Sequence, residues 1–274
     1  MASTLATSDP VAPTLGRQRR RKPHPLRRVV LPFVGVAVLI ALWQLVCVVF
    51  DVPTYIIPRP TDVFSTLTSE RSLILTHLQP TLLETIAGFL IGNGVAVVLA
   101  ILFVHWRSAE RALMPVAIFI RTIPIVAIAP VLVIMLGNGY APKIVIAALI
   151  SFFPTLVNMV KGLDAVDRQA MELMKVLSAS RRETFFKVRM YASLPYLYAS
   201  LKIATGNAVI GAIVAEWIGS QKGLGYLIIQ STYNYDTPLL YSVMVAASLI
   251  AVVFYALVEI AERLTVKWNP EETP

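Results

Sequence analysis

Residues 161–193, KGLDAVDRQAMELMKVLSASRRETFFKVRMYAS, form a polar segment in an otherwise apolar chain. The segment carries 11 charged side chains, whereas the stretches on either side of it, 144–160 and 194–217, carry two between them. Apolar stretches of about 20 residues are long enough to cross a bilayer as helices. The segment is therefore predicted to be a polar connection between two membrane spans.

The same criterion finds spans along the rest of the chain. The 274 residues are 57% hydrophobic and 15% charged, with a mean hydropathy of +0.70, whereas soluble domains average about 45–50% and about 25%. These values argue against a soluble globular protein and exclude disorder for most of the chain. The predicted fold class is an all-α membrane protein with six transmembrane helices, over residues 29–50, 85–104, 113–136, 144–160, 194–217 and 238–258.

The basic residues indicate which ends share a side of the membrane. Of the 24 Lys and Arg residues, 18 lie in the N-terminal tail, the 105–112 loop, the 161–193 segment and the C-terminal tail. The loops on the opposite side of the membrane hold four Lys and Arg residues. Because Lys and Arg are retained on the cytoplasmic side, both termini and residues 161–193 are predicted to be cytoplasmic. The net charge of +8 then reports topology, and no nucleic-acid partner is expected.

These assignments divide the chain into five parts. Residues 1–28 are a basic cytoplasmic tail, 29–50 the first helix, 51–81 an external loop with an interfacial helix over 61–78, 82–264 the core and 265–274 a C-terminal tail. A Gly88–Gly92 pair and a face of small residues on 208–215 predict close helix packing. The single cysteine, Cys47, excludes an intrachain disulfide and a cysteine metal cluster. No metal or cofactor is predicted.

Residues 161–193 have internal helix signals of their own. Ser180 followed by Glu183 fits a capping box, which predicts a short helix ending near Ala179 and another starting at Arg181. Phe185 and Phe186 give the second helix an apolar patch among basic residues. Two interpretations remain open at this point: an amphipathic helix on the lipid interface, or a docking surface for a cytoplasmic partner.

In this segment the sequence resembles the inner-membrane permease subunits of bacterial ABC importers. Their signature reads Glu-Ala-Ala, three residues, Gly, nine residues, then Ile-x-Leu-Pro, and the spacing matches here from Glu172 to Tyr191. The identities depart from it at Leu173, Met174, Ser178 and Tyr191. The resemblance extends through RTIPIVAIAPVLVIMLGNG (121–139), FFPTLVNMVKGLDAVD (152–167) and YLYASLKIATGNAVIGAIVAEWIGSQKGLGYLI (196–228), and covers about residues 30–268.

The resemblance implies a MetI-like permease fold and a division of labour. A second permease subunit, most simply another copy, would complete the pathway. Two cytoplasmic ATP-binding subunits would supply energy, and an extracytoplasmic binding protein would deliver substrate. The phosphate-binding pattern GxxxxGK[ST] is absent from the chain, so no ATPase or other enzyme activity is expected of it. The residues expected to couple to the ATPase are Glu172, Leu173, Ser178, Ala179, Ser180, Glu183, Phe185 and Phe186.

Four residues are candidates for the pathway. Arg121 lies in a span, where a charge normally faces a polar cavity or a partner; it either contacts substrate or pairs internally, with Glu84 as a counter-charge. Glu216 and Trp217 lie near the outer end of the fifth span, where lining the mouth, capping the helix or sitting in the interfacial belt are alternatives. Helix kinks are expected at Pro124, Pro130 and Pro154.

The substrate class is predicted from resemblance alone. The chain looks like the branch of the family that handles sulfonates, nitrate, taurine and pyrimidine compounds. Glu84, Glu216-Trp217-Ile218-Gly219 and MELMKVLSAS favour riboflavin or a thiamine pyrimidine precursor over aliphatic sulfonate, taurine or nitrate. An ion-coupled secondary transporter and a membrane enzyme are the rival classes. The scattered histidines and the lack of acidic residues in the middle of a span speak against both.

Overall fold

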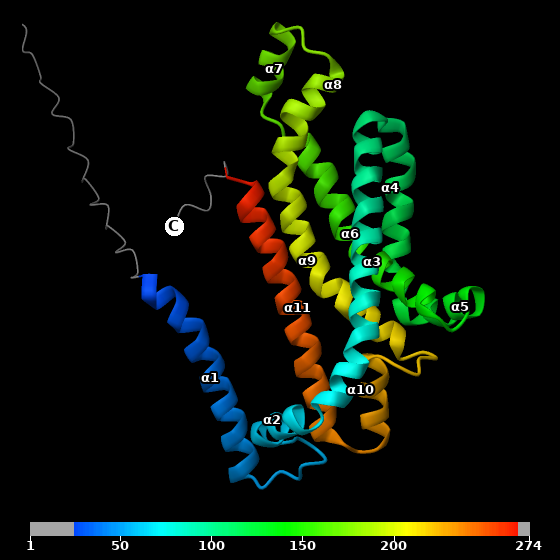
Figure 1. The fold of residues 1–274 in the computed structure, drawn as a ribbon. Helices are drawn as coiled ribbons and strands as arrows, with labels where there is room; N and C mark the ends of the chain where they lie inside the picture. The colour runs from blue at the N-terminus through cyan, green and yellow to red at the C-terminus, as the bar shows by residue number, and fades with distance from the viewer. Residues whose placement is uncertain (1–24, 268–274) are drawn as a thin grey trace, which may run out of the picture.

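The computed structural model describes residues 25–267, which form helices joined by short loops, with no strand among them (Figure 1). Most of the two predicted tails, 1–28 and 265–274, lies outside this part of the chain. In chain order the elements are α1 Pro25–Val49, α2 Pro60–Ser69, α3 Arg71–His105, α4 Arg107–Thr122, α5 Ile125–Leu136, α6 Tyr140–Asp164, α7 Arg168–Val176, α8 Arg181–Thr184, the π-helix η1 Phe185–Arg189, α9 Met190–Glu216, α10 Leu224–Tyr233 and α11 Thr237–Thr265.

Helices α3, α6 and α9 form the centre of the molecule, with α6 packed against both of the others. Small residues let the backbones approach closely. A Cβ atom on Gly88 would lie 2.5 Å from the Cβ of Ala147, and one on Gly211 would lie 2.8 Å from the Cα of Ala147. The close packing predicted for these small residues is therefore confirmed, and Ala147 of α6 lies at the crossing of all three helices.

Helix α11 flanks α9 and is joined to it by an ion pair. The Nζ atom of Lys202 on α9 contacts Oε2 of Glu262 on α11, and both side chains are largely buried. The carboxylate of Glu262 within reach makes the buried position of the Lys202 ammonium tolerable. The pair fixes the register between the two helices.

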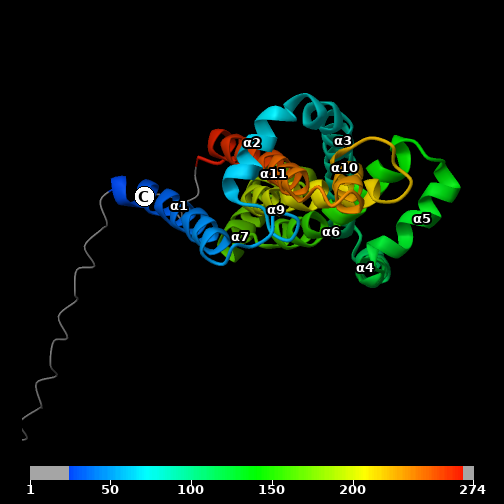
Figure 2. The same ribbon diagram turned by 90° about the horizontal axis from the view of Figure 1, so that it is seen from below.

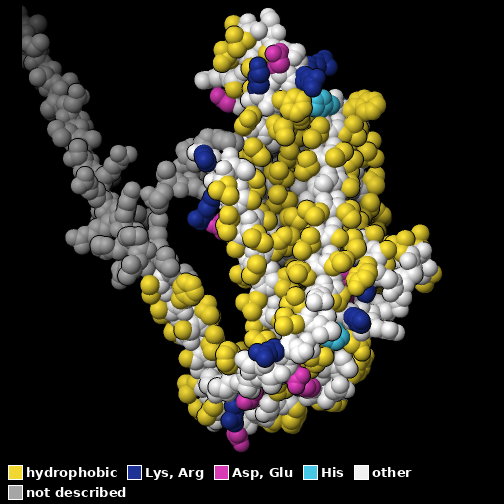
Figure 3. Space-filling model, in the orientation of Figure 1, with side chains coloured by type: hydrophobic (Ala, Val, Ile, Leu, Met, Phe, Trp, Pro, Cys, Tyr) yellow, Lys and Arg dark blue, Asp and Glu magenta, His cyan; other side chains and the backbone are white. Residues whose placement is uncertain are grey.

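Helices α1 and α5 lie on opposite sides of the centre in both ribbon views (Figures 1 and 2). Helix α1 stands apart from the other long helices and meets them through α2 and through Trp43, whose ring centroid is 5.7 Å from that of Tyr241 on α11. Figure 3 shows hydrophobic side chains covering the long flank of the molecule, with charged ones mostly near its two ends. This distribution is that of a protein embedded in a bilayer.

Four helices within the described residues are long and apolar enough to cross a membrane: Arg71–His105, Tyr140–Asp164, Arg181–Glu216 and Thr237–Thr265. Helices α4 and α5 meet the same test together but are bent by 98°. Residues Phe33–Val49 of α1 form a shorter apolar helix. The six predicted apolar stretches thus all fall in helices, but the third is broken.

The break lies at Ile123 and Pro124, inside the stretch 113–136 that was expected to be one span. Ile123 has φ −72° and ψ 125°, an extended conformation. Proline disfavours the helical conformation of the residue before it and donates no hydrogen bond, so the helix ends there. Pro130 and Pro154 lie inside α5 and α6, which continue through them without interruption.

The predicted external loop contains two helical pieces rather than one over 61–78. Helix α2 ends at Ser69, and α3 starts at Arg71 and continues into the bundle. We refer below to the end of the molecule that carries α2 and α10 as the α10 end, and to the opposite one, where α7 and α8 project beyond the bundle, as the α7 end (Figure 1).

Candidate coupling segment and pathway

The turn between α7 and α8 is closed by backbone hydrogen bonds. The N–H of Ser178 donates to the carbonyl oxygen of Lys175 and that of Ala179 to Met174, both at 2.9 Å. This pair of bonds is a Schellman motif, which requires a left-handed residue after the helix. Ser178 has φ +50°, at the position where the resembled signature carries glycine.

The capping box predicted for Ser180 and Glu183 is present. The Glu183 N–H donates to Ser180 Oγ at 3.2 Å, and the Ser180 N–H donates to Glu183 Oε2 at 2.9 Å. Together with the Schellman motif, the box sets the angle between α7 and α8 by local bonds alone. The two helices therefore form a hairpin whose shape is set by its own residues.

Substitutions at Ser178 and Ser180 should change the stability of the hairpin in opposite directions. Ser178→Gly should stabilise the hairpin by about 1 kcal/mol, because a left-handed serine is strained. Ser180→Ala should destabilise it by about 1 kcal/mol, because the cap is lost. Hydrogen exchange of the amides of residues 178–184 measures both, and faster exchange in Ser178→Gly would contradict the strain argument.

Phe185 and Phe186 have different surroundings although they are neighbours. Phe185 is 7% exposed and packs in the cluster that contains Phe103, Leu156 and Leu163 of α3 and α6, with its ring centroid 4.9 Å from that of His105. Phe186 is 50% exposed. Phe185 thus anchors the hairpin to the bundle, and Phe186 belongs to its outer surface.

The outer surface of the hairpin combines apolar and charged side chains. Leu173, Val176 and Leu177 are more than half exposed, and Glu172 pairs with Arg168 at 3.1 Å on the surface. An apolar patch of this kind at the tip of a protruding hairpin is suited to a protein partner.

Asp164 at the end of α6, which sequence reasoning did not single out, pairs with residues of two other elements. Its Oδ1 atom is 2.8 Å from the guanidinium of Arg107 at the start of α4 and 3.6 Å from that of Arg189 at the end of η1. No periodicity brings residues 57 positions apart together, so nothing local in the sequence signalled this junction. It links the last turn of α6 to the start of α4 and to the end of η1.

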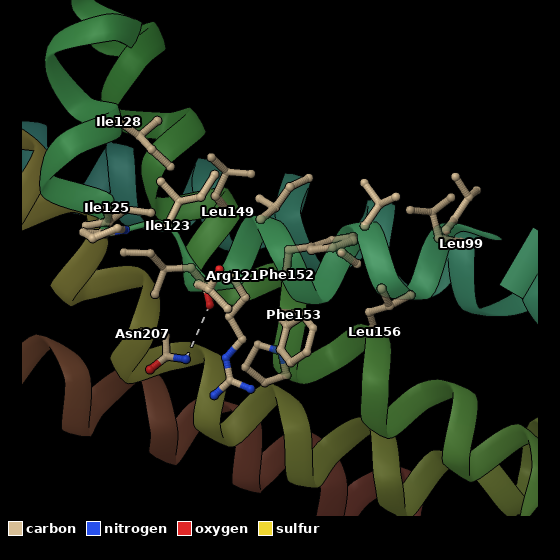
Figure 4. A pocket seen from close by; sticks show the side chains of 18 of the residues that line it. Leu99, Arg121, Ile123, Ile125, Ile128, Leu149, Phe152, Phe153, Leu156 and Asn207 are labelled. Atoms are coloured by element: carbon tan, nitrogen blue, oxygen red, sulfur yellow. Dashed lines mark hydrogen bonds between the residues drawn. The ribbon is translucent and has the colours of Figure 1, made fainter. Parts of the chain in front are cut away.

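A cavity of about 620 Å³ lies between α4, α5, α6 and α9 and includes Arg121 (Figure 4). The guanidinium of Arg121 lies 4.5 Å from the ring centroid of Phe153. Asn207 of α9, another residue that sequence reasoning missed, donates from Nδ2 to the carbonyl oxygen of Ile150 at 3.5 Å. The rest of the lining is mainly apolar apart from Thr122, so the cavity offers an aromatic face and three polar side chains.

The other pathway candidates lie away from this cavity. Glu84 was considered a counter-charge for Arg121, but its Oε1 atom is 3.3 Å from Nζ of Lys143 instead. Glu84 and Glu216 are both fully buried near the α10 end, and Trp217 is exposed at the end of α9. None of these three residues lines the cavity of Arg121.

A bundle of membrane-crossing helices with a protruding, anchored hairpin and an internal cavity defines a multi-pass membrane permease. Residues 69–268 match the family described as "Binding-protein-dependent transport system inner membrane component". The chain belongs to this family of ABC importer permeases, and the resemblance noted in the sequence is confirmed.

Named relatives match most of the chain. The chain is 35% identical to a "Probable ABC transporter permease protein" of Haemophilus influenzae, over 83% of this chain and 93% of the relative. It is 31% identical to the "Riboflavin transport system permease protein RibX" of Chloroflexus aurantiacus, over 89% and 93%. It is 30% identical to the "Formylaminopyrimidine transport permease protein ThiX" of Halalkalibacterium halodurans, over 85% and 94%.

The fold has a solved counterpart. A chain of the MetNI methionine ABC transporter, in an inward facing conformation, matches with a TM-score of 0.61 and 16% identity, over 72% of this chain and 97% of that chain. The predicted MetI-like permease fold is therefore confirmed.

Proposed function

We propose that two copies of this chain form the membrane pathway of an ATP-driven importer for a planar heteroaromatic nutrient, riboflavin or a pyrimidine precursor of thiamine. In this proposal the α7 end faces the cytoplasm, as the basic residues predict, and binds one ATPase subunit per copy. An extracytoplasmic binding protein delivers substrate to the α10 end.

The observation that carries the importer role is the construction of the α7–α8 hairpin. Its local shape is set by two capping motifs, its exposed surface is apolar at Leu173 and Val176, and its base is anchored through Phe185. A hairpin with a fixed shape, an exposed apolar surface and an anchored base can transmit force from a bound partner to the bundle. A helix that rests on lipid needs neither the anchor nor the caps. This favours docking over the lipid-interface interpretation.

The exposed side of the cavity supports the proposal that a second copy of the chain completes the pathway. The face formed by the end of α4 and by α5 is exposed in one chain, including Ile120, Ile123 and Val126. A second copy placed against this face would cover these side chains and close the cavity into a shared passage.

The substrate proposal combines the cavity with two relatives. RibX and ThiX are named for riboflavin and formylaminopyrimidine, both planar heteroaromatic compounds. An aromatic side chain, a guanidinium and an amide in a mainly apolar cavity suit such a ring, through stacking and a few directed hydrogen bonds.

Uptake into vesicles tests the proposal. The chain would be reconstituted with its ATPase subunits and binding protein, and riboflavin, hydroxymethylpyrimidine and taurine would be offered separately. Uptake of one of the first two should require ATP hydrolysis. Uptake of taurine alone would overturn the substrate class, and uptake driven by an ion gradient without the ATPase would overturn the importer role.

The same vesicles test Arg121. Arg121→Gln should lower uptake about tenfold, because a hydrogen bond to a charged group contributes about 1.5–3 kcal/mol. Arg111→Gln is the matched control, since Arg111 lies on the same helix but does not line the cavity. Equal uptake by both variants would place the pathway elsewhere.

A further inference from the structure

Three ionisable side chains meet inside the bundle near the α10 end. Glu84 of α3, Glu216 at the end of α9 and Lys143 of α6 are each at most 7% exposed. If all three are ionised, the cluster carries one uncompensated negative charge. Burying an unpaired charge among membrane-crossing helices costs several kcal/mol, so the protonation state of the cluster needs a physical account.

Glu216 is well suited to be the ionised carboxylate. Its Oε1 atom accepts a hydrogen bond from the hydroxyl of Thr81, and its Oε2 atom accepts one from the N–H of Gly225, both at 2.6 Å. Gly225 lies in the first turn of α10, where the helix dipole favours a negative charge. Gly223, at φ +117°, leaves room for the Glu216 carboxylate, because a Cβ atom at this position would collide with it.

Glu84 has the opposite surroundings. No N–H or O–H donor reaches either of its carboxyl oxygens in hydrogen-bonding geometry among the described residues. The ammonium of Lys143 lies 3.3 Å from Oε1 of Glu84 and also donates to the hydroxyl of Ser220 at 2.8 Å. An ionised Glu84 would therefore depend on one ammonium that it shares with Ser220, whereas Glu216 accepts two hydrogen bonds of 2.6 Å, and buried carboxylates normally have their donors in place.

The two carboxyl groups are in contact with each other. Glu216 accepts a hydrogen bond from Thr81, which lies one turn before Glu84 on α3, so the two buried carboxyl groups are close neighbours that interact electrostatically. Two neighbouring carboxyl groups in a buried site do not both ionise, because the like charges repel at low dielectric. A proton on Glu84 would turn this contact into a hydrogen bond that Glu216 accepts.

We propose that the Glu84–Glu216 pair is a proton-binding site, with one proton held on Glu84 and donated to the ionised Glu216. The cluster then contains one negative and one positive charge, and the hydrogen-bond contact between the carboxyl groups has a donor. Release of the proton to water would leave two adjacent carboxylates against a single ammonium. The inference concerns the folded chain itself and does not depend on the proposed substrate or importer role.

The other titratable groups around the pair are accounted for. The Nδ1 atom of His77 accepts the N–H of Gly223 at 3.2 Å and therefore carries no proton, and Tyr226 of α10 stacks on the His77 ring. Tyr140 lies under Lys143, with its ring centroid 5.9 Å from Nζ. The remaining charge nearby, Lys222, lines the surface cavity described next. None of these groups supplies Glu84 with a donor.

The proton also has a route to solvent. A small cavity at the α10 end is lined by Lys143, Ser220 and Lys222, among others. It reaches the ammonium that faces Glu84, so water entering there comes within one residue of the carboxyl pair. The proposed proton thus lies where α3, α6, α9 and α10 meet, next to a residue that lines a cavity at the surface.

Two isosteric variants test the assignment. Glu84→Gln keeps a neutral donor toward Glu216, so the purified permease should have a melting temperature close to that of the unmodified protein and a folded yield within about twofold of it. Glu216→Gln removes the single negative charge opposite Lys143, and the folded yield should fall at least tenfold. Equal losses in both variants, or a loss only in Glu84→Gln, would overturn the proposal.

Infrared spectroscopy detects the protonated carboxyl group directly, and this test does not depend on whether Glu216→Gln folds. The unmodified protein should show the C=O stretch of a protonated carboxyl group at neutral pH, and Glu84→Gln should lack this band. Glu262→Gln, which changes another buried acidic residue, should keep it. Absence of the band from the unmodified protein, or its persistence in Glu84→Gln, would refute the bound proton.

Discussion

Replacing Phe185 by alanine should lower the free energy of unfolding by about 3–5 kcal/mol, because a buried phenylalanine is removed from a packed cluster. The side chain is 7% exposed and lies against Phe103, Leu156 and Leu163. Under the proposed function the same variant should hydrolyse ATP with little substrate uptake, because the hairpin loses its anchor to α3 and α6. Thermal unfolding in detergent and the ratio of uptake to hydrolysis in vesicles measure the two effects.

Phe186 and a conservative change at Phe185 are the controls. Phe186→Ala should leave stability nearly unchanged, since this ring is half exposed, but it should weaken binding of the ATPase subunit. Phe185→Leu keeps most of the buried volume and should cost less than about 1.5 kcal/mol, with coupling restored. If Phe186→Ala is the less stable variant, the division of roles between the two rings is wrong.

Replacing Gly92 by leucine should prevent recovery of folded protein. A Cβ atom on Gly92 would overlap the carbonyl oxygen of Ala148 and lie 2.8 Å from Oγ of Ser151. Backbone atoms of α6 cannot move aside without separating the helices, so the cost should exceed the roughly 1–3 kcal/mol typical of overpacking. Monodispersity and thermal unfolding of the solubilised permease measure the effect.

Gly94 is the matched control on the same helix. A Cβ atom there would meet nothing within 4 Å, and the residue is exposed on the flank of α3. Gly94→Leu should therefore leave the protein folded, and the better helix propensity of leucine should stabilise it slightly. Similar recovery of both leucine variants would contradict the close approach of α3 and α6.

Features that depend on neighbours in the sequence were predictable. Hydropathy located the helices, because crossing a bilayer requires a long apolar run wherever the helix lies in the bundle. The Ser180–Glu183 capping box followed from a spacing of three residues, since its bonds close within one turn. The break before Pro124 was expected only as a kink, because the size of the bend depends on what surrounds it.

Features that depend on tertiary contacts were not predictable from one sequence. Phe185 and Phe186 are chemically identical, and only the position of the hairpin against α3 and α6 separates them. The partner of Glu84 turned out to be Lys143 rather than Arg121, because charges in different helices can pair in several ways that hydropathy does not distinguish. The junction at Asp164 and the place of Asn207 in the cavity have the same origin.

The break between α4 and α5 has a consequence for the life of the protein before it is assembled. Ending one helix and starting another inside an apolar stretch leaves carbonyl and N–H groups without helical partners, and the adjoining Ile120 and Ile123 are exposed in a single chain. Unpaired backbone groups are tolerated at membrane depth only when protein or water covers them. If a second copy covers this face as proposed, a newly inserted single chain would keep these groups uncovered until its partner arrives.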